Sequence, residues 1–327
     1  MMTLLKRISA ALAAASWLLW PAADVLAQAF PSKPIRLVVP YGPGGLPDVM
    51  ARLVAQKMSE SMGQPVNVEN KPGASGIIAA EFVAKSDPDG HTLFVGDIAQ
   101  YALNPALRTN LPYDTLRDFV PVTQALRAPL FLMVNAGLGV KSVAELVALA
   151  KARPGINYGS SGNASVHQLG MEQFALMAGF KVQHIPYKGV AQAVPAMLAG
   201  DTQLMFVSPT SAGIGEQVKA GRVVILAVGS SQRWAQLPNV PTMAEAGFAL
   251  EAVSNIGFFT RTGTPAPVVA KLHAELVRAL KAPDVESKMP GLGAVVVAGT
   301  PEEFTARIRA DQAVYAKLVK EVRVTVD

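Results

Sequence analysis

A glycine-rich corner between an apolar strand and a helical pattern is the first stretch of the sequence that could bind a ligand. The run 35–39 is apolar, and Gly42, Gly44 and Gly45 follow it closely. Glycines leave little side-chain bulk, so backbone N–H groups can face a guest at the start of the next helix, where the macrodipole favours negative charge. The predicted chemistry is capture of a small anion. A turn that binds nothing is the alternative, because a lone glycine-rich loop is a weak motif.

Four later loops also follow apolar strands and carry polar side chains. They lie at Asp97, Ser160, Tyr187 and Ser208. Ligands of open α/β sheets bind outside the carboxyl ends of strands, so these loops qualify together with the glycine corner. We expect a carboxylate held by main-chain N–H and hydroxyl groups rather than by an arginine fork. Simple helix N-capping is the alternative for the Ser160 loop, and it is the commoner role of such residues.

Motifs of enzymes are not matched. The sequence contains no GxxxxGK[ST], the glycine corner does not fit GxGxxG, and 159–163 misses GxSxG at its last position. The four histidines show no close metal-ligand spacing, and the chain has no cysteine, which excludes disulfides and thiol catalysis. A hydrolase using Ser161 and His167 is the enzymatic alternative, and it is disfavoured. We therefore expect no catalytic residue, no metal and no cofactor.

The elements that must position these loops alternate between strand and helix, which predicts an α/β fold with parallel-rich sheets flanked by helices. The segment 104–118 reads as a loop. The expected strands are 35–39, 66–70, 92–95, 130–134, 156–158, 182–185, 204–207, 223–228, 256–260 and 294–297, and the expected helices are 49–62, 77–85, 143–152, 166–177, 191–198, 213–220, 265–280, 284–289 and 302–322.

The first residues read as an export signal. A basic start, an apolar stretch and a small-residue pattern predict a signal peptide over 1–27, cleaved after Ala27 or Ala29. We expect an exported periplasmic protein. The net charge of +5 is mild for 327 residues and the charges are scattered, so no nucleic-acid partner is expected.

About 300 mature residues exceed what one hydrophobic core usually supports, so two domains are expected. The C-terminal elements are too few for a third domain, and we expect them to return to the first. We expect lobe 1 over 30–130 plus 257–327 and lobe 2 over 131–256, with two hinge crossings near 130–134 and 256–260. We also expect a monomer.

Twelve stretches of the chain are similar, in order and spacing, to the Bug family, the periplasmic solute-binding proteins of tripartite tricarboxylate transporters. The resemblance covers essentially the whole mature sequence. The stretches are PSKPIRLVVPYGPGG with Asp48, GQPVNVENKPGASG, PDGHTLFVG, NPAL with LPYD, KSVAELVALAKARPG, NYGSSGN, HIPYKG, AGDTQLMF, KAGRVVILAV, LPNVPTMAEAG, GTPAPVV and GTPEEF.

The resemblance implies a two-lobed Venus-flytrap fold that captures a small carboxylate and delivers it to a membrane permease. Family members hold a ligand carboxylate at the first strand-to-helix loop, here 41–45, partly through ordered waters. The second lobe contributes the loop 160–165 and the turn 187–189. A ligand sensor for a signalling receptor is the alternative within binding.

Departures from the family pattern bear on the ligand. Leu46 and Pro47 stand where Ser or Thr is usual, Val207 replaces a common aspartate, Gln168 a frequent histidine, and Asp97 lies in a loop that is more often Ser or Thr. We expect a more apolar wall at Leu46 and Val207, and an aromatic or aliphatic monocarboxylate or dicarboxylate as ligand. An amino acid paired with Asp97 is the alternative.

The complete set of ligand-binding residues expected from these considerations draws on both lobes. Its members are Tyr41, Gly42, Pro43, Gly44, Gly45, Asp48, Asp97, Gln100, Ser160, Ser161, Gly162, Asn163, Ser165, Tyr187, Lys188 and Val207.

Overall fold

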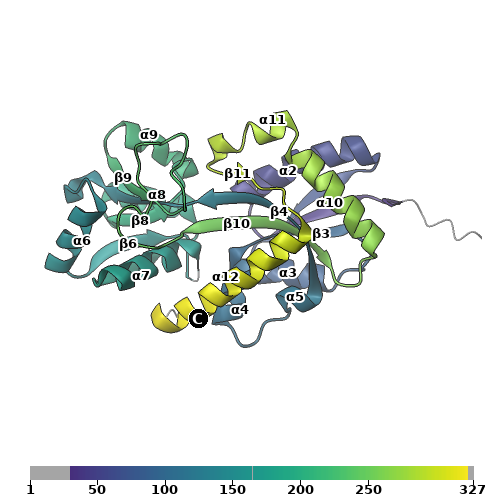
Figure 1. Ribbon diagram of the computed structural model, residues 1–327, viewed down its shortest axis with the longest axis horizontal. Coiled ribbons are helices and arrows are strands. Elements are labelled where there is room, and N and C mark those ends of the chain that lie inside the picture. Colours follow the sequence, from purple (N-terminus) through teal and green to yellow (C-terminus); the bar gives the residue numbers. More distant parts are fainter. Residues whose placement is uncertain (1–29, 164, 323–327) are drawn as a thin grey trace, which may run out of the picture.

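The computed structural model describes residues 30–163 and 165–322, which form two lobes side by side, each built on one sheet with helices around it (Figure 1). The predicted signal peptide over 1–27 lies outside the described residues. Within the described ranges, no helix combines the length and the apolar character that crossing a membrane requires.

Local sequence patterns place most of the elements correctly. The bounds of β1, β2, β8, β9 and α6 are those predicted. The strands are β1 Ile35–Val39, β2 Val66–Asn70, β3 Thr92–Asp97, β4 Phe119–Pro129, β5 Phe131–Asn135, β6 Ile156–Ser160, β7 Val182–Pro186, β8 Leu204–Val207, β9 Val223–Val228, β10 Val253–Arg261 and β11 Val295–Val296. The helices are α2 Leu46–Met62, α3 Ile77–Ala84, α4 Asn104–Leu107, α5 Thr115–Asp118, α6 Val143–Ala152, α7 Val166–Ala178, α8 Val190–Ala199, α9 Ile214–Lys219, α10 Ala266–Leu280, α11 Pro283–Glu286 and α12 Pro301–Val322.

Helix α2 begins three residues before its predicted start. Pro47 lies in its first turn, where a fixed φ and a missing N–H are tolerated. The helix ends at Gly63, whose left-handed φ of 67° lets its N–H bond the Ser59 carbonyl. The glycine corner is therefore tied directly to the start of a 17-residue helix.

Both sheets are mixed, whereas the strand–helix alternation predicted parallel-rich sheets. The sheet of lobe 1 has the order β11-β4-β10-β3-β1-β2, in which only β1 pairs in parallel, with β2 and β3. The sheet of lobe 2 has the order β7-β6-β8-β5-β9, with β6 parallel to β7 and β8, and β5 antiparallel to both its neighbours. The antiparallel pairs arise where β4, β5 and β10 carry the chain between the lobes.

Strand β4 is the main element that the sequence pattern missed. The alternation of apolar and polar residues in β4 is interrupted by Pro121, Gln124 and Arg127, so its sequence does not show the two-residue period of a strand. Its partner defines it instead, because β4 pairs with β10 from Phe119↔Arg261 to Pro129↔Val253, with two register shifts.

The two crossings between lobes lie next to each other. Leu130, between β4 and β5, donates its N–H to the Ala252 carbonyl and accepts the N–H of Gly229, each at 2.8 Å. Ala252 in turn donates to the Gly229 carbonyl at 2.8 Å. Because β10 joins the sheet of lobe 1 at Val253, a boundary at 256/257 falls inside that strand.

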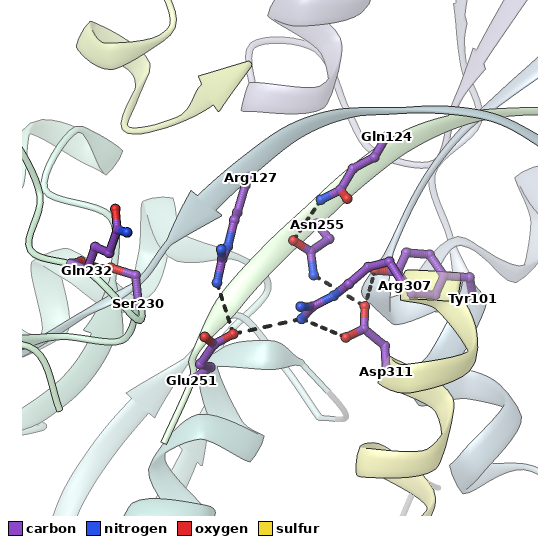
Figure 2. Close-up of polar contacts among 9 residues, drawn as sticks. All are labelled: Tyr101, Gln124, Arg127, Ser230, Gln232, Glu251, Asn255, Arg307 and Asp311. Atoms are coloured by element: carbon purple, nitrogen blue, oxygen red, sulfur yellow. Dashed lines mark hydrogen bonds and ion pairs between the residues drawn. The ribbon is translucent and has the colours of Figure 1, made fainter. Parts of the chain in front are cut away.

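Polar side chains brace these crossings against α12 (Figure 2). Glu251 Oε2 accepts a hydrogen bond from Arg127 Nη2 at 2.9 Å and lies 4.0 Å from Arg307 Nη2. Arg307 also pairs with Asp311 at 2.8 Å. The buried carboxylate of Asp311 accepts from Tyr101 and Asn255 as well. The last helix is therefore fastened to the crossing strands by charge as well as by packing.

One hydrophobic cluster runs through both lobes. In lobe 1 it joins Phe259 of β10 to Phe304 and Ile308 of α12, and in lobe 2 it includes Tyr158 and Phe174. Separate clusters cover the other faces, with α2 and α10 on the sheet of lobe 1 and α8 and α9 on the sheet of lobe 2. The strand ends that carry the candidate loops are thus held on sheets with hydrophobic clusters packed against both faces.

Candidate functional site

The glycine corner is shaped by a carboxylate of its own. Asp48, in the first turn of α2, accepts the Gly44 N–H at 2.9 Å on Oδ2 and a hydrogen bond from Asn70 Nδ2 at 2.8 Å on Oδ1. Arg52 Nε donates to Oδ2 at 3.0 Å, and Asn70 also donates to the Tyr41 carbonyl at 3.0 Å. Asp48 is only 2% exposed. It therefore joins the ends of β1 and β2 to α2.

The charge of Asp48 is well stabilised. Burial acts to raise the pKa of its carboxyl, but hydrogen bonds from Arg52, Gly44 and Asn70 outweigh this and hold the pKa below its usual value. The Gly44 N–H, which we expected to bind a ligand, is thus already bonded to the Asp48 carboxylate. The exposed Gly42 and Gly45 make no hydrogen bond through their N–H groups to the described residues, so these two remain available.

A second buried carboxylate lies at the end of the neighbouring strand β3. Tyr41 donates its hydroxyl hydrogen to Asp97 Oδ2 at 2.6 Å, and the Ala99 N–H reaches Oδ1 at 2.8 Å. Gln100 Nε2 donates to the Tyr41 hydroxyl at 3.1 Å, while its Oε1 accepts the Asp97 N–H at 2.9 Å. The structure therefore brings Tyr41, Asp97 and Gln100 together at the ends of β1 and β3.

Asp97 differs from Asp48 in having no cation beside it among the described residues. Burial raises the pKa of Asp97, and the hydrogen bonds from Tyr41 and Ala99 only partly offset this effect. The pKa of Tyr41 is raised well above its usual value by burial and by the adjacent Asp97 charge. The Tyr41 hydroxyl donates to Asp97 and accepts from Gln100, so this side chain holds Asp97 and Gln100 in place.

A loop between β2 and α3 joins this cluster, and sequence reasoning did not assign it a binding role. Gly73, Ala74, Ser75 and Gly76 all have positive φ, at 131°, 46°, 54° and 85°. Such φ values are rare for Ala and Ser and concentrate at functional sites. Gln100 Nε2 donates to the Ser75 carbonyl at 3.1 Å, and Asn104 Nδ2 does the same. The stretch KPGASG between strand and helix was the available signal.

In lobe 2 the loop after β6 is held by its own serines. Ser160 is fully buried, and its Oγ lies 2.9 Å from the Gly162 carbonyl oxygen and 2.6 Å from His184 Nε2. Ser165 donates to the same carbonyl at 2.8 Å and caps α7 by accepting the Gln168 N–H. Capping, the alternative reading of this loop, is thus observed for Ser165. Asn163 is exposed.

Ser161 and His167 form a hydrogen-bonded pair, at 2.8 Å between Oγ and Nδ1. Burial lowers the pKa of His167 to about 4, which makes it a weak base at neutral pH. Among the described residues, no carboxylate forms a hydrogen bond or ion pair with this ring to complete a triad. Ser161 and His167 therefore lack the third group that orients the histidine of a catalytic triad, which argues against the hydrolase alternative.

The remaining predicted residues differ in exposure. The Tyr187 N–H donates to the Ser160 carbonyl at 3.2 Å, so the two loops of lobe 2 adjoin. Lys188 is exposed and forms no ion pair with the described residues. Val207 is completely buried in the cluster around Phe131, away from any surface, whereas Leu46 is half-buried against the core of lobe 1.

Two other features lie apart from these loops. A cavity of about 260 Å³ is lined by Lys33, Arg36, Asp89 and His91, at the amino ends of β1 and β3 and thus opposite the glycine corner. Across residues 30–163 and 165–322, no group of three or more His, Asp or Glu side chains is arranged to hold a metal ion.

Comparisons with known proteins agree with this architecture. BugT of Bordetella pertussis is 35% identical over 304 residues, covering 92% of this chain and 92% of BugT. A solved R. palustris protein with adipate has a TM-score of 0.82 and 33% identity, covering 90% of this chain and 99% of that one. MatC from Rhodopseudomonas palustris with bound malate has a TM-score of 0.78 and 29% identity, covering 89% and 100%.

The family model described as "Tripartite tricarboxylate transporter family receptor" matches residues 50–323, which is most of the chain. Together with the similarity to BugT across nine-tenths of both sequences, this match settles the family. The chain belongs to the tripartite tricarboxylate transporter receptor family and is a relative of the Bug proteins within it.

Proposed function

We propose that this protein is a periplasmic receptor that binds a small carboxylate and passes it to a membrane permease of the tripartite tricarboxylate type. Membership of the receptor family carries the proposal. The similar structures solved with adipate and with malate support a carboxylate as the ligand class. The protein acts as an exported monomer that binds without breaking a bond.

The ligand carboxylate binds at the glycine corner in this proposal. The free N–H groups of Gly42 and Gly45 are its main-chain donors in lobe 1, since Asp48 already takes the Gly44 N–H. The exposed Asn163 and Lys188 are the contributors from lobe 2, and Lys188 supplies a positive charge without a competing partner among the described residues. Asp48, Ser160 and Ser165 act by holding their loops in shape.

A thermal-shift screen against carboxylic acids, starting with adipate and malate, tests the ligand class. A ligand present at about 100 times its dissociation constant raises the free energy of unfolding by roughly 2.7 kcal/mol. We expect at least one monocarboxylate or dicarboxylate to shift the melting temperature. A screen in which no acid has any effect would remove the proposal.

Gly42 is the best position for testing the glycine corner. No atom lies within 4 Å of where its Cβ would be, and its φ is ordinary, so Gly42→Ala and Gly42→Val add bulk without backbone strain. Gly44, with a φ of 90°, would be strained by any side chain. We expect Gly42→Val to remove the ligand-induced shift and Gly42→Ala to reduce it, while both unliganded proteins melt as the wild type does.

Ser161→Ala tests the proposal of binding without catalysis. The weakly basic His167 cannot activate the Ser161 hydroxyl efficiently near neutral pH. We expect no turnover of a methyl ester of the best ligand by either the wild type or the variant. Turnover by the wild type that the substitution abolishes would restore the hydrolase alternative.

A further inference from the structure

The Ser160 hydroxyl has two acceptors within hydrogen-bond distance but only one hydrogen. Its Oγ lies 2.9 Å from the Gly162 carbonyl oxygen and 2.6 Å from His184 Nε2, and it accepts the Gly162 N–H at 3.1 Å. A serine hydroxyl donates one hydrogen bond and accepts two. If Ser160 donated to His184, its oxygen would face the Gly162 carbonyl with no hydrogen between them. All three contacts of Ser160 Oγ are hydrogen bonds only when His184 donates from Nε2 and Ser160 donates to the Gly162 carbonyl.

His184 is held in the orientation that this arrangement needs. Its ring stacks on Tyr158, with centroids 4.9 Å apart and planes 23° from parallel. Tyr158 is itself fixed, because its hydroxyl donates to Glu172 Oε1 at 2.5 Å. Burial lowers the pKa of His184 to about 4, so the ring carries a single hydrogen at neutral pH.

The Gly162 carbonyl accepts two of the three serine hydroxyls of the loop, those of Ser160 and Ser165, while Ser161 pairs with His167. The peptide that follows it is trans, so the Asn163 N–H points to the side opposite this carbonyl. That N–H makes no hydrogen bond within the described part of the chain. The inward carbonyl and the outward N–H are two consequences of one peptide orientation.

We infer that His184 is a positioning residue of the binding site: acting through Ser160, it turns the Gly162 carbonyl inward and presents the Asn163 N–H as a donor to the ligand carboxylate. The identity of the ligand rests on the proposed function. The hydrogen-bond chain from His184 to Gly162 rests on the geometry alone. The site then contains one main-chain donor in lobe 2 to match those of the glycine corner.

Calorimetric titration with adipate tests the binding role. His184→Phe keeps a flat ring on Tyr158 but loses the donor, and Ser160→Ala loses the relay. We expect each to weaken binding about tenfold, and His184→Gln, which keeps a donor, to recover most of the loss. In the double variant His184→Phe/Ser160→Ala the loss should equal that of Ser160→Ala alone, because His184 acts through that hydroxyl. Additive losses would overturn the inference.

Nitrogen-15 NMR of the wild-type histidine rings gives a second readout that needs no ligand. We expect His184 to be the Nε2–H tautomer, and an Nδ1–H tautomer would overturn the inference even if His184→Phe weakened binding. If no carboxylic acid binds the wild type, the proposed function fails, and the tautomer still decides whether His184 holds the loop as described. Melting temperatures of all variants identify any that fail to fold.

Discussion

Two buried aspartates flank the glycine corner, and their surroundings shift their pKa values in opposite directions. Asp48 accepts hydrogen bonds from Arg52, Gly44 and Asn70, which stabilise its charge. Asp97 accepts from Tyr41 and Ala99 only, and burial dominates. One carboxylate is therefore a structural anion at neutral pH, while the other carries a cost for being charged.

Removing the Asp48 carboxylate should destabilise the fold. Asp48→Ala leaves the Gly44 N–H and the Asn70 amide without their acceptor, so we expect the free energy of unfolding to fall by about 2 kcal/mol or more. Asp284→Ala is the control, since it removes an exposed ion pair with Lys57 and should change little. Urea unfolding at pH 7 measures both. Equal effects would mean that Asp48 is not a structural anchor.

The charge of Asp97 should appear in the pH dependence of stability. Because its folded-state pKa lies above the usual 3.8, the folded protein retains a proton that the unfolded chain releases, so stability falls as pH rises from 3.8 through the folded-state pKa. Asp97→Asn removes the titrating group and with it this pH-dependent contribution to the free energy of unfolding. We expect the stability of the variant relative to wild type to increase with pH over this range and then stay level, in urea unfolding between pH 3.5 and 7. A difference that is independent of pH would contradict it.

Asp97→Ala addresses the ligand instead. If an amino acid pairs with this carboxylate, the substitution should weaken binding of the amino acid and leave a simple carboxylic acid of similar length unaffected. Titration calorimetry with adipate and with 6-aminohexanoate compares the two. An unchanged preference would dismiss the amino-acid alternative.

Among the elements, the short loop between β2 and α3 has four consecutive positive φ values, and those of Ala74 and Ser75 are strained because these residues carry a Cβ. Gln100 and Asn104 hold this loop through the Ser75 carbonyl. Gln100 also contacts Tyr41, so the loop, β1 and β3 depend on one amide side chain. A change in the loop should therefore be felt at Tyr41 and Asp97.

Gly76→Ala tests that coupling. Its Cβ would lie 2.5 Å from Gln100 Nε2, so Gln100 must move. Gly179→Ala is the control, because its φ of 70° imposes a similar strain, about 1 kcal/mol, with no atom within 4 Å. We expect Gly76→Ala to lower the free energy of unfolding by at least about 1 kcal/mol more than the control, and to weaken ligand binding. Matching losses in unfolding experiments would show that Gln100 adjusts without cost.

At the scale of the whole molecule, the lobes touch at a point far from the crossings in sequence. Gly293, between α11 and β11, approaches the loop after β8, and a Cβ there would clash with Ser208 Oγ and lie 2.9 Å from Thr210 Oγ1. Figure 1 shows the α11–β11 segment reaching toward the lobe that carries β8 and α9. A side chain at this position would force the Ser208 and Thr210 hydroxyls to move, or the two lobes to separate.

Gly293→Ala should therefore disfavour the observed arrangement of the lobes. Gly63→Ala is a close control, because both glycines end helical turns with similar φ, 75° and 67°, and Gly63 has open space around it. We expect similar strain in both variants, but a larger radius of gyration by X-ray scattering and weaker ligand binding only for Gly293→Ala. An unchanged radius and affinity would show that the contact between Gly293 and Ser208 does not determine how the lobes are arranged.

The sequence by itself determined most of the elements and the family. Apolar periodicity, glycines and prolines are local, so they located β1, the glycine corner and α6, and they indicated an α/β chain of two lobes. The loops after β1, β3 and β6 were identified because parallel strands present their carboxyl ends at one edge. The family resemblance required only motif order.

The tertiary structure decided which groups remain free. The sequence could not show that Asp48 accepts the Gly44 N–H or that Ser160 donates its hydroxyl hydrogen to Gly162. It also could not show that Val207 lies in the core. It also missed β4, whose strand identity comes from β10, more than 120 residues later. The physical reason is the same in each case. Hydrogen-bond partners and buried neighbours are distant in sequence, and they are fixed only once the two sheets have formed and the chain has crossed twice between them.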